Sequence, residues 1–183
     1  MLRYGLAPAS GHRPTLYLRA TRALARPRES EAALGFAARP LAGVPLRIAG
    51  EVRISNNGSY REVRPAAFAV TELPPVNLPL GLRAETYAQA GYVGGRFATA
   101  FVDGQARLDG LLASLGRDAV LRAGAGMWGG AQKDAARLDL GPSATAALRI
   151  GRAQTRIALD YRLRVAGDAE PKSGPALTIS AGF

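Results

Sequence analysis

The chain has 183 residues, the size of one domain, and its 24 basic against 14 acidic residues give a net charge of +10. It has no cysteine and a single histidine, His12, which excludes disulfides, cysteine nucleophiles and multi-histidine metal sites. The charged and apolar fractions, 21% and 48%, are too balanced for a disordered chain, and no apolar run approaches the roughly 20 residues of a helical membrane span.

Apolar and polar residues alternate along the chain with period two, which is typical of β-strands whose two faces differ. The clearest alternation occupies residues 46–55, 136–150 and 155–165. Glycine, proline and asparagine gather between such segments and mark turns. Residues 107–115 form the one stretch that could instead be a short helix. The predicted strands, in chain order, are 2–7, 16–21, 34–39, 46–55, 66–71, 82–92, 98–108, 121–127, 136–150, 155–165 and 177–183.

This pattern predicts an all-β fold: an antiparallel up-and-down barrel of about 10–12 strands, forming a single domain over residues 1–183. In a soluble barrel the apolar residues would face the core, whereas in an outer-membrane barrel they face lipid. The longer segments reach the 9–11 residues of a tilted membrane strand. The apolar positions are largely alanine and leucine, which suits a lipid-facing surface better than a two-sheet core. We therefore predict a transmembrane β-barrel with its polar residues inward.

The arginines indicate which face lines the lumen. Lys133 and Lys172 are the only lysines, so 24 − 2 = 22 of the basic residues are arginines, and they recur on the polar face of nearly every strand. Asp103, Asp109, Asp139 and Asp160 are expected to pair with them as lumen groups, not to form a catalytic pair. The predicted lumen residues are Arg47, Glu51, Arg53, Arg83, Glu85, Arg107, Arg122, Arg137, Asp139, Arg149, Arg156, Asp160, Arg162 and Arg164. The residues predicted to face outward are Leu46, Ile48, Leu138, Leu140, Ile157, Leu159, Leu163, Leu177, Ile179 and Phe183.

The C-terminus carries the most specific signal. The chain stops on Phe183, and every second position before it is apolar: Ala181, Ile179 and Leu177. This ending resembles the C-terminal signature of Gram-negative outer-membrane proteins, which the barrel-assembly machinery reads. The resemblance implies a location in the outer membrane, contact with lipid and lipopolysaccharide, and an assembly signal formed by Leu177, Ile179 and Phe183.

A second resemblance is carried by the arginine-bearing strands, the glycine-rich segment 124–130, and the endings 161–165 and 175–183. Together they look like the C-terminal barrels of the bacteriophage adsorption protein A family and of the cellulose-synthase outer-membrane subunit. In those proteins the barrel follows a helical-repeat periplasmic region. The resemblance implies a role in exopolysaccharide export or as a phage receptor, and it brings no catalytic motif.

The number of predicted strands raises a question of completeness. If Phe183 ends at the periplasmic side, the eleven predicted strands give an odd count, whereas bacterial single-chain barrels have an even number. Either residues 2–7 do not span the membrane, which leaves ten strands, or the chain is the C-terminal part of a larger barrel. The lack of a signal peptide favours the second interpretation, with further N-terminal strands upstream.

No segment predicts enzyme chemistry, a cofactor or a metal site. Ser10 and His12 lie in a proline-bounded turn, without a strand to orient them as a catalytic pair. The glycine-rich segments 91–95 and 124–126 do not open helices, so they do not predict phosphate loops. The arginines are spread evenly and not gathered in one patch, which disfavours nucleic-acid binding.

The excess of arginine predicts a positive lumen that attracts anions. Two roles stay open. The barrel could pass or anchor an acidic polysaccharide, or its lumen could be plugged by its own arginine–carboxylate ladders, leaving it as an anchor for a larger periplasmic partner. An alternative to the membrane barrel is a soluble periplasmic β-barrel that binds an anionic or lipidic ligand.

Overall fold

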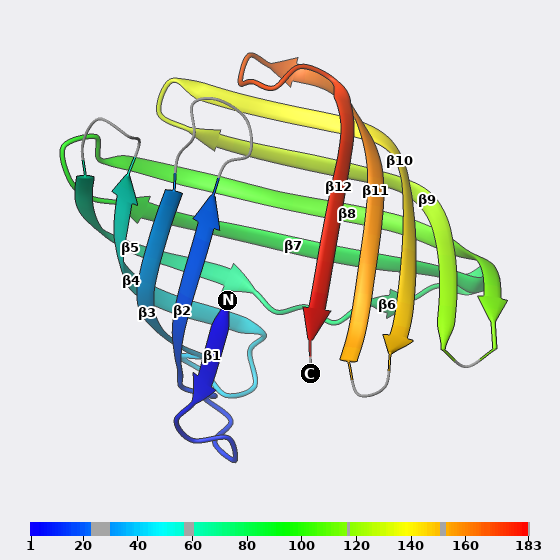
Figure 1. Cartoon of the computed structure of the whole chain (residues 1–183), viewed down its shortest axis with the longest axis horizontal. Coiled ribbons are helices and arrows are strands. Elements are labelled where there is room, and N and C mark those ends of the chain that lie inside the picture. Colours follow the sequence, from blue (N-terminus) through cyan, green and yellow to red (C-terminus); the bar gives the residue numbers. More distant parts are fainter. Residues whose placement is uncertain (23–29, 57–60, 117, 151–152, 183) are drawn as a thin grey trace. The chain divides into compact units, whose positions relative to one another are not determined.

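The computed structural model describes residues 1–22, 30–56, 61–116, 118–150 and 153–182. These residues form an all-β fold, which confirms the fold class predicted from the alternation (Figure 1). The strands are β1 (Leu2–Gly5), β2 (Thr15–Arg22), β3 (Ser30–Ala38), β4 (Leu46–Asn56), β5 (Arg61–Thr71), β6 (Val76–Asn77), β7 (Leu82–Val93), β8 (Thr99–Leu115), β9 (Ala119–Gln132), β10 (Ala135–Ile150), β11 (Ala153–Gly167) and β12 (Gly174–Gly182).

The twelve strands form one antiparallel up-and-down sheet, in which strand order follows chain order from β1 to β12. The two-residue strand β6 lies off this path and pairs with β7. Among the described residues β1 pairs only with β2 and β12 only with β11, so the sheet is not closed, and a closed barrel stays a prediction. Consecutive antiparallel pairing is what the short connections allow, since hairpins join neighbouring strands without a crossover.

Several strands of this sheet are unusually long. The mode for strands in globular proteins is about 5–6 residues, whereas β8 has 17 residues, β10 has 16 and β11 has 15. Strand β1 has only 4 residues, and β6 has 2. Ten strands of the described chain therefore have eight residues or more.

The chain divides into two compact units, which we describe separately. Unit 1 comprises Met1–Leu73 and Ala88–Val102, and unit 2 comprises Pro74–Tyr87 and Asp103–Phe183. Residue Phe183 itself lies outside the described residues, as do 23–29, 57–60, 117 and 151–152. The prediction of a single barrel domain over residues 1–183 stays a prediction.

The short helix considered for residues 107–115 is wrong, because this stretch belongs to β8. Arg107 and Asp109 are buried while Leu108 is exposed, so the period-two alternation simply continues. Strand β8 has hydrogen-bonded neighbours on both sides, β7 and β9, and these pairings outweigh the weak local helix preference. The only helical segment in the described chain is the 3₁₀ turn Pro79–Gly81, and no helix there has the length and apolar character to cross a membrane.

Candidate functional site

The two faces of the sheet have the reverse of the usual polarity of a soluble protein. The polar face, which we define by the side chains sharing a side with Glu51 in unit 1 and Asp160 in unit 2, is the buried one. The opposite, apolar face is exposed. Buried side chains include Glu51, Arg107, Asp109, Asp139, Ser143, Thr145 and Asp160. Exposed side chains include Leu16, Leu18, Leu34, Phe36, Ile48, Val52, Leu108, Leu140, Leu159, Leu163, Leu177 and Ile179.

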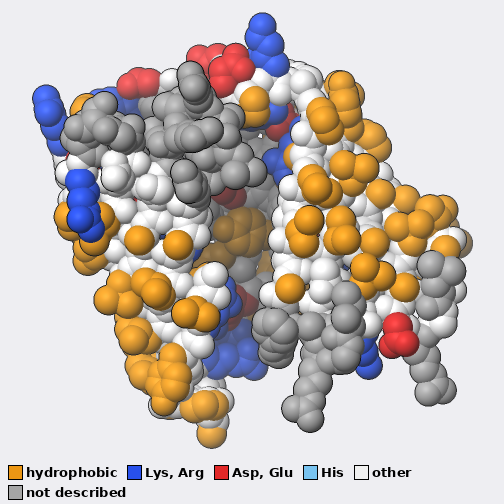
Figure 2. All heavy atoms as spheres, viewed as in Figure 1, with side chains coloured by type: hydrophobic (Ala, Val, Ile, Leu, Met, Phe, Trp, Pro, Cys, Tyr) orange, Lys and Arg blue, Asp and Glu red, His pale blue; other side chains and the backbone are white. Residues whose placement is uncertain are grey.

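Figure 2 shows hydrophobic side chains spread over the visible surface of β10, β11 and β12, and separately over the lower part of unit 1. Charged side chains are almost never fully buried unless they are paired, so the buried face needs an internal network of partners. Both units provide one.

In unit 1 the network centres on Glu51 of β4, whose side chain is 1% exposed. The Tyr17 hydroxyl donates a hydrogen bond to Oε2 of Glu51 at 2.7 Å. Arg19 and Arg53 donate to Oε1 at 3.1 and 2.5 Å. The carboxylate is therefore held by two guanidinium groups and one hydroxyl, the kind of charge-assisted bonding that makes a buried carboxylate tolerable.

Tyr17 reaches Glu51 by crossing the intervening strand. Tyr17 pairs with Gly35 in register, and Gly35 pairs with Glu51, so the three residues form one row across β2, β3 and β4. A Cβ atom at Gly35 would come within 2.4 Å of Tyr17 Cζ, shorter than any real contact. The glycine therefore leaves the space in which the tyrosine ring lies.

We expect Gly35→Ala to displace the Tyr17 ring and break its bond to Glu51, lowering the free energy of unfolding by about 1–3 kcal/mol, the usual cost of overpacking. Gly50→Ala is the matched control, because nothing lies within 4 Å of a methyl group added there. The measurement is the urea midpoint of each variant, refolded under the same conditions. Equal midpoints for the two variants would show that the row Tyr17–Gly35–Glu51 does not matter.

Two further carboxylates of unit 1 extend the network. Glu31 is ion-paired to Arg19 at 2.8 Å, so Arg19 bridges two acids. Glu72 accepts from Arg39 at 2.6 Å and is ion-paired to Arg47 at 2.8 Å. In the described part of unit 1, five arginines (19, 39, 47, 53 and 64) form ion pairs with four glutamates (31, 51, 62 and 72).

The polar face of unit 1 also holds a small apolar cluster. Tyr17, Ala37 and Ala49 are buried together, and Phe68 packs against them. Phe68 in turn lies 6.5 Å from Phe101, measured between ring centroids. This contact accounts for Phe101, whose sequence position puts it on the polar side of the alternation.

In unit 2 the network centres on Asp160 of β11, whose side chain is completely buried. Its Oδ2 accepts hydrogen bonds from Arg107 at 2.8 Å and from Arg162 at 3.4 Å. Its Oδ1 accepts a hydrogen bond from the Ser143 hydroxyl at 2.7 Å. Both oxygens of the carboxylate are thus bonded.

The ion pairs of unit 2 show that its sheet curls strongly toward the polar face. Arg107 of β8 reaches Asp160 of β11 across two intervening strands, and Arg156 of β11 reaches Glu85 of β7 at 2.6 Å across three. Strands lie about 4.8 Å apart, so β7 and β11 would be separated by roughly 19 Å in a flat sheet. That is more than an arginine and a glutamate span together, and only a curved sheet brings them into contact. Figure 1 shows β9 and β10 bending along their length.

The remaining pairs of unit 2 line the same face. Arg83 contacts Glu85 at 2.6 Å and Asp109 at 3.9 Å. Asp109 also pairs with Arg122, and Asp139 with Arg137 at 2.6 Å. In total, six arginines (83, 107, 122, 137, 156 and 162) meet four carboxylates (85, 109, 139 and 160), so this network carries an excess of positive charge.

The structure places the predicted lumen residues as follows. Arg149 is exposed at the end of β10. Arg164 is half-buried and donates to the carbonyl of Ala169 at 3.1 Å. All the others take part in the ion pairs of the polar face: Arg47, Glu51, Arg53, Arg83, Glu85, Arg107, Arg122, Arg137, Asp139, Arg156, Asp160 and Arg162. Of the predicted assembly signal, Leu177 and Ile179 are exposed on β12, whereas Phe183 lies outside the described residues.

Sequence reasoning missed Tyr17, Arg19, Glu31, Glu72 and Trp128 as members of the networks. A local signal marks part of each network, because several pairs lie two residues apart on one strand. These are Glu51 with Arg53, Glu62 with Arg64, Arg83 with Glu85, Arg137 with Asp139, and Asp160 with Arg162. Residues i and i+2 of a strand share a face, so opposite charges at this spacing predict ion pairs directly.

Ser10 and His12 contact each other through the backbone of His12. The Ser10 hydroxyl accepts a hydrogen bond from the backbone N–H of His12, and Nδ1 of the imidazole bonds the carbonyl oxygen of Arg39 at 2.9 Å. Since a carbonyl only accepts, Nδ1 carries the proton. Nowhere in the described part of the chain do three or more potential metal ligands gather.

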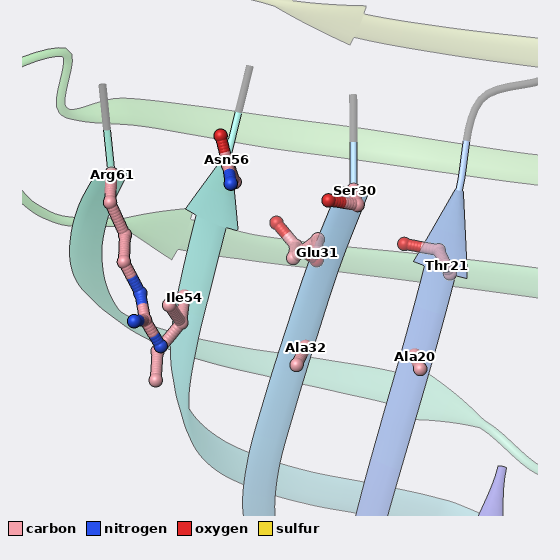
Figure 3. Close-up of a pocket in the computed structure, with 8 residues that line it drawn as sticks. All are labelled: Ala20, Thr21, Ser30, Glu31, Ala32, Ile54, Asn56 and Arg61. Carbon is pink, nitrogen blue, oxygen red and sulfur yellow. The ribbon is translucent and has the colours of Figure 1, made fainter. Parts of the chain in front are cut away.

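A cavity of about 510 Å³ lies in unit 1, where β2 and β4 end and β3 and β5 begin. Figure 3 shows the Arg61 side chain running beside Ile54 within this cavity. Glu31 is already committed to ion pairs with Arg19 and Arg64, and the remaining lining is mostly small. We assign the cavity no function. Its lining residues are Ala20, Thr21, Ser30, Glu31, Ala32, Ile54, Asn56 and Arg61.

Comparison of the chain with protein-family models, with curated proteins and with solved structures found no match. The functional proposal therefore depends on the residues and geometry of this chain.

Proposed function

We propose that the chain is a β-barrel domain of a bacterial outer membrane, with its apolar face against lipid and its polar face around an interior. The observation that carries this proposal is the reversed polarity: long strands bury ion-paired arginines and carboxylates while exposing leucine, isoleucine and valine. This is the arrangement that a bilayer requires of a spanning sheet.

The free energy cost of exposing the apolar face to water supports the same proposal. Moving a leucine or isoleucine side chain from water into an apolar environment is worth about 1.5–3 kcal/mol. Monomeric soluble proteins rarely expose contiguous apolar patches larger than a few hundred Å². The exposed aliphatic side chains lie on both units and on most long strands. A soluble periplasmic barrel would need another layer of protein to cover them, so lipid is the better-supported neighbour.

Between the two roles considered for the barrel, the ion-pair networks favour a membrane anchor over an open pore. Asp160, Glu51 and Asp139 are buried within their networks, and two arginines, Arg107 and Arg156, reach across more than one strand to their partners. Side chains that cross-link the polar face in this way occupy interior space. We propose an anchor for a larger surface protein of the exopolysaccharide-export or phage-receptor type, without enzyme activity of its own.

The test is the electrophoretic mobility of the full chain after refolding in lipid vesicles, run in SDS with and without boiling. We expect the unboiled protein to migrate as a folded species and the boiled protein to migrate as unfolded chain, because a closed membrane sheet has no unpaired strand edge for detergent to open. Refolding in buffer without lipid is the control. A chain that folds equally well without lipid, and shows no shift on boiling, would support the soluble barrel instead.

A further inference from the structure

Unit 2 contains a cluster of cationic and N–H-bearing side chains that exceeds the acceptors around it. Arg107 and Arg162 share the single carboxylate of Asp160. Both guanidinium groups also lie over the ring of Trp128, with Cζ atoms 5.7 and 4.8 Å from the ring centroid. Two positive charges and one negative charge are thus brought together against one aromatic side chain.

Three N–H donors of this cluster have no hydrogen-bond partner among the described residues. They are Nε of Arg107, Nε of Arg162 and Nε1 of Trp128, and all three are buried. Arg107 and Trp128 are 8% and 5% exposed. An unbonded buried donor costs about 1–3 kcal/mol, and more when it is charged. Both oxygens of Asp160 are already bonded, Oδ2 to Arg107 and Arg162 and Oδ1 to Ser143.

The neighbouring charges do not remove the excess. Asp139 lies opposite Trp128 in the pairing of β9 with β10; its Oδ2 pairs with Arg137 at 2.6 Å, and its buried Oδ1 has no hydrogen-bond partner among the described residues. This single acceptor is fewer than the three unbonded donors of the cluster. The Trp128 ring lies over Gly126, where an added Cβ would come within 2.4 Å of its ring carbons, so the ring is fixed close to the strand. Arg162 is the accessible member of the cluster, with 30% of its side chain exposed.

We propose that Arg107, Arg162 and Trp128 form a binding site for a small oxyanion, such as the carboxylate of an acidic sugar or a free phosphate ion. The anion balances the second guanidinium charge and accepts hydrogen bonds from the unbonded N–H groups of the three side chains. It enters from the exposed side of Arg162. Arginine suits this role because its planar donors match carboxylate and phosphate oxygens. The site goes beyond the proposed membrane anchor and does not depend on it, since all three residues belong to unit 2.

Trp128 is the only tryptophan of the chain, so its fluorescence reports on this site alone. The experiment uses the full chain refolded in micelles of a non-ionic detergent and measures quenching of Trp128 by iodide at constant ionic strength. We expect quenching that saturates, because iodide binds beside the ring. Glucuronate should protect against it, and glucose, its uncharged counterpart, should not.

Arg162→Gln should weaken iodide binding and glucuronate protection about tenfold, the effect of losing one charged hydrogen-bond donor. Arg149→Gln is the matched control, since it removes the same charge from an exposed position at the end of β10. Equal quenching of the wild type and Arg162→Gln would overturn the proposal, and so would an equal loss in Arg149→Gln. If Arg162→Gln does not refold, the wild-type protein alone tests the proposal. Equal protection of its Trp128 by glucuronate and by glucose would overturn the proposed site.

Two additional ligands identify the source of the anion. Stronger protection by tetragalacturonate than by inorganic phosphate, at equal concentration, supports an acidic polysaccharide as the occupant. If phosphate protects Trp128 as well as tetragalacturonate or better, the result supports a site for a free ion. Failure of the membrane proposal would appear in the gel assay as loss of the lipid requirement, and it would leave this fluorescence result unchanged.

Discussion

Leu159→Arg should destabilise the protein in lipid vesicles by about 2–4 kcal/mol, the cost of an arginine facing lipid near the middle of a bilayer. Leu159 lies in the middle of β11, between Ala144 of β10 and Leu177 of β12, and 55% of its side chain is exposed. On a water-exposed surface the same change would alter stability by no more than about 0.5 kcal/mol. The measurement is the urea midpoint in vesicles, followed by Trp128 fluorescence.

Leu41→Arg is the matched control for this variant. Leu41 is a leucine of similar exposure, 63%, but it lies in the connection between β3 and β4 and not on a long strand. We expect its midpoint to stay close to that of the wild type. If both leucines tolerate arginine equally well, the exposed face of β11 does not contact lipid.

Asp160→Asn should cost about 3–5 kcal/mol, the effect of removing one partner from a buried ion pair. The variant keeps the shape of the side chain but leaves Arg107, which is 8% exposed, without a counter-charge. Unfolding by urea in detergent micelles measures the loss. Asp168→Asn is the control, because Asp168 is exposed just after β11.

A second variant separates the charge of Asp160 from its packing. Asp160→Asn combined with Arg107→Met also removes the buried charge of Arg107 and leaves only the partly exposed Arg162 without its carboxylate, so we expect the double variant to recover much of the lost stability. A double variant that is no more stable than Asp160→Asn alone would show that the ion pair does not hold β8 against β11. So would equal midpoints for Asp160→Asn and Asp168→Asn.

The strands could be predicted because their signal is local. The alternation over residues 155–165 predicts a strand whose even positions share a face, and β11 has Ala158 and Asp160 buried with Leu159 exposed between them. The same period of two explains why opposite charges at positions 51 and 53 meet. The stretch 107–115 was open to a helical interpretation because its residues are compatible with both structures, and its neighbours β7 and β9 decided the outcome.

The networks themselves could not be predicted, because they depend on register and curvature. Tyr17, Gly35 and Glu51 meet only because two hairpins align them in one row, and no spacing within a single strand encodes that alignment. Similarly, Arg156 meets Glu85 only because the sheet curls through the strands between β7 and β11. Trp128 stood out in the sequence only as part of a glycine-rich segment. Its contact with Arg107 comes from the neighbouring strand β8, and its contact with Arg162 of β11 comes from the same curvature.

The contact between the apolar face and lipid is tested most directly by spin labels placed along β11 in vesicles. The chain has no cysteine, so each introduced cysteine carries the only label. We predict high accessibility to oxygen and low accessibility to a water-soluble nickel complex at Leu159, Tyr161 and Leu163, and reduced oxygen accessibility at Arg156, Arg162 and Arg164. This period-two pattern follows from lipid on one face of the strand only. High accessibility to the nickel complex at Leu159, Tyr161 and Leu163 would contradict the membrane proposal.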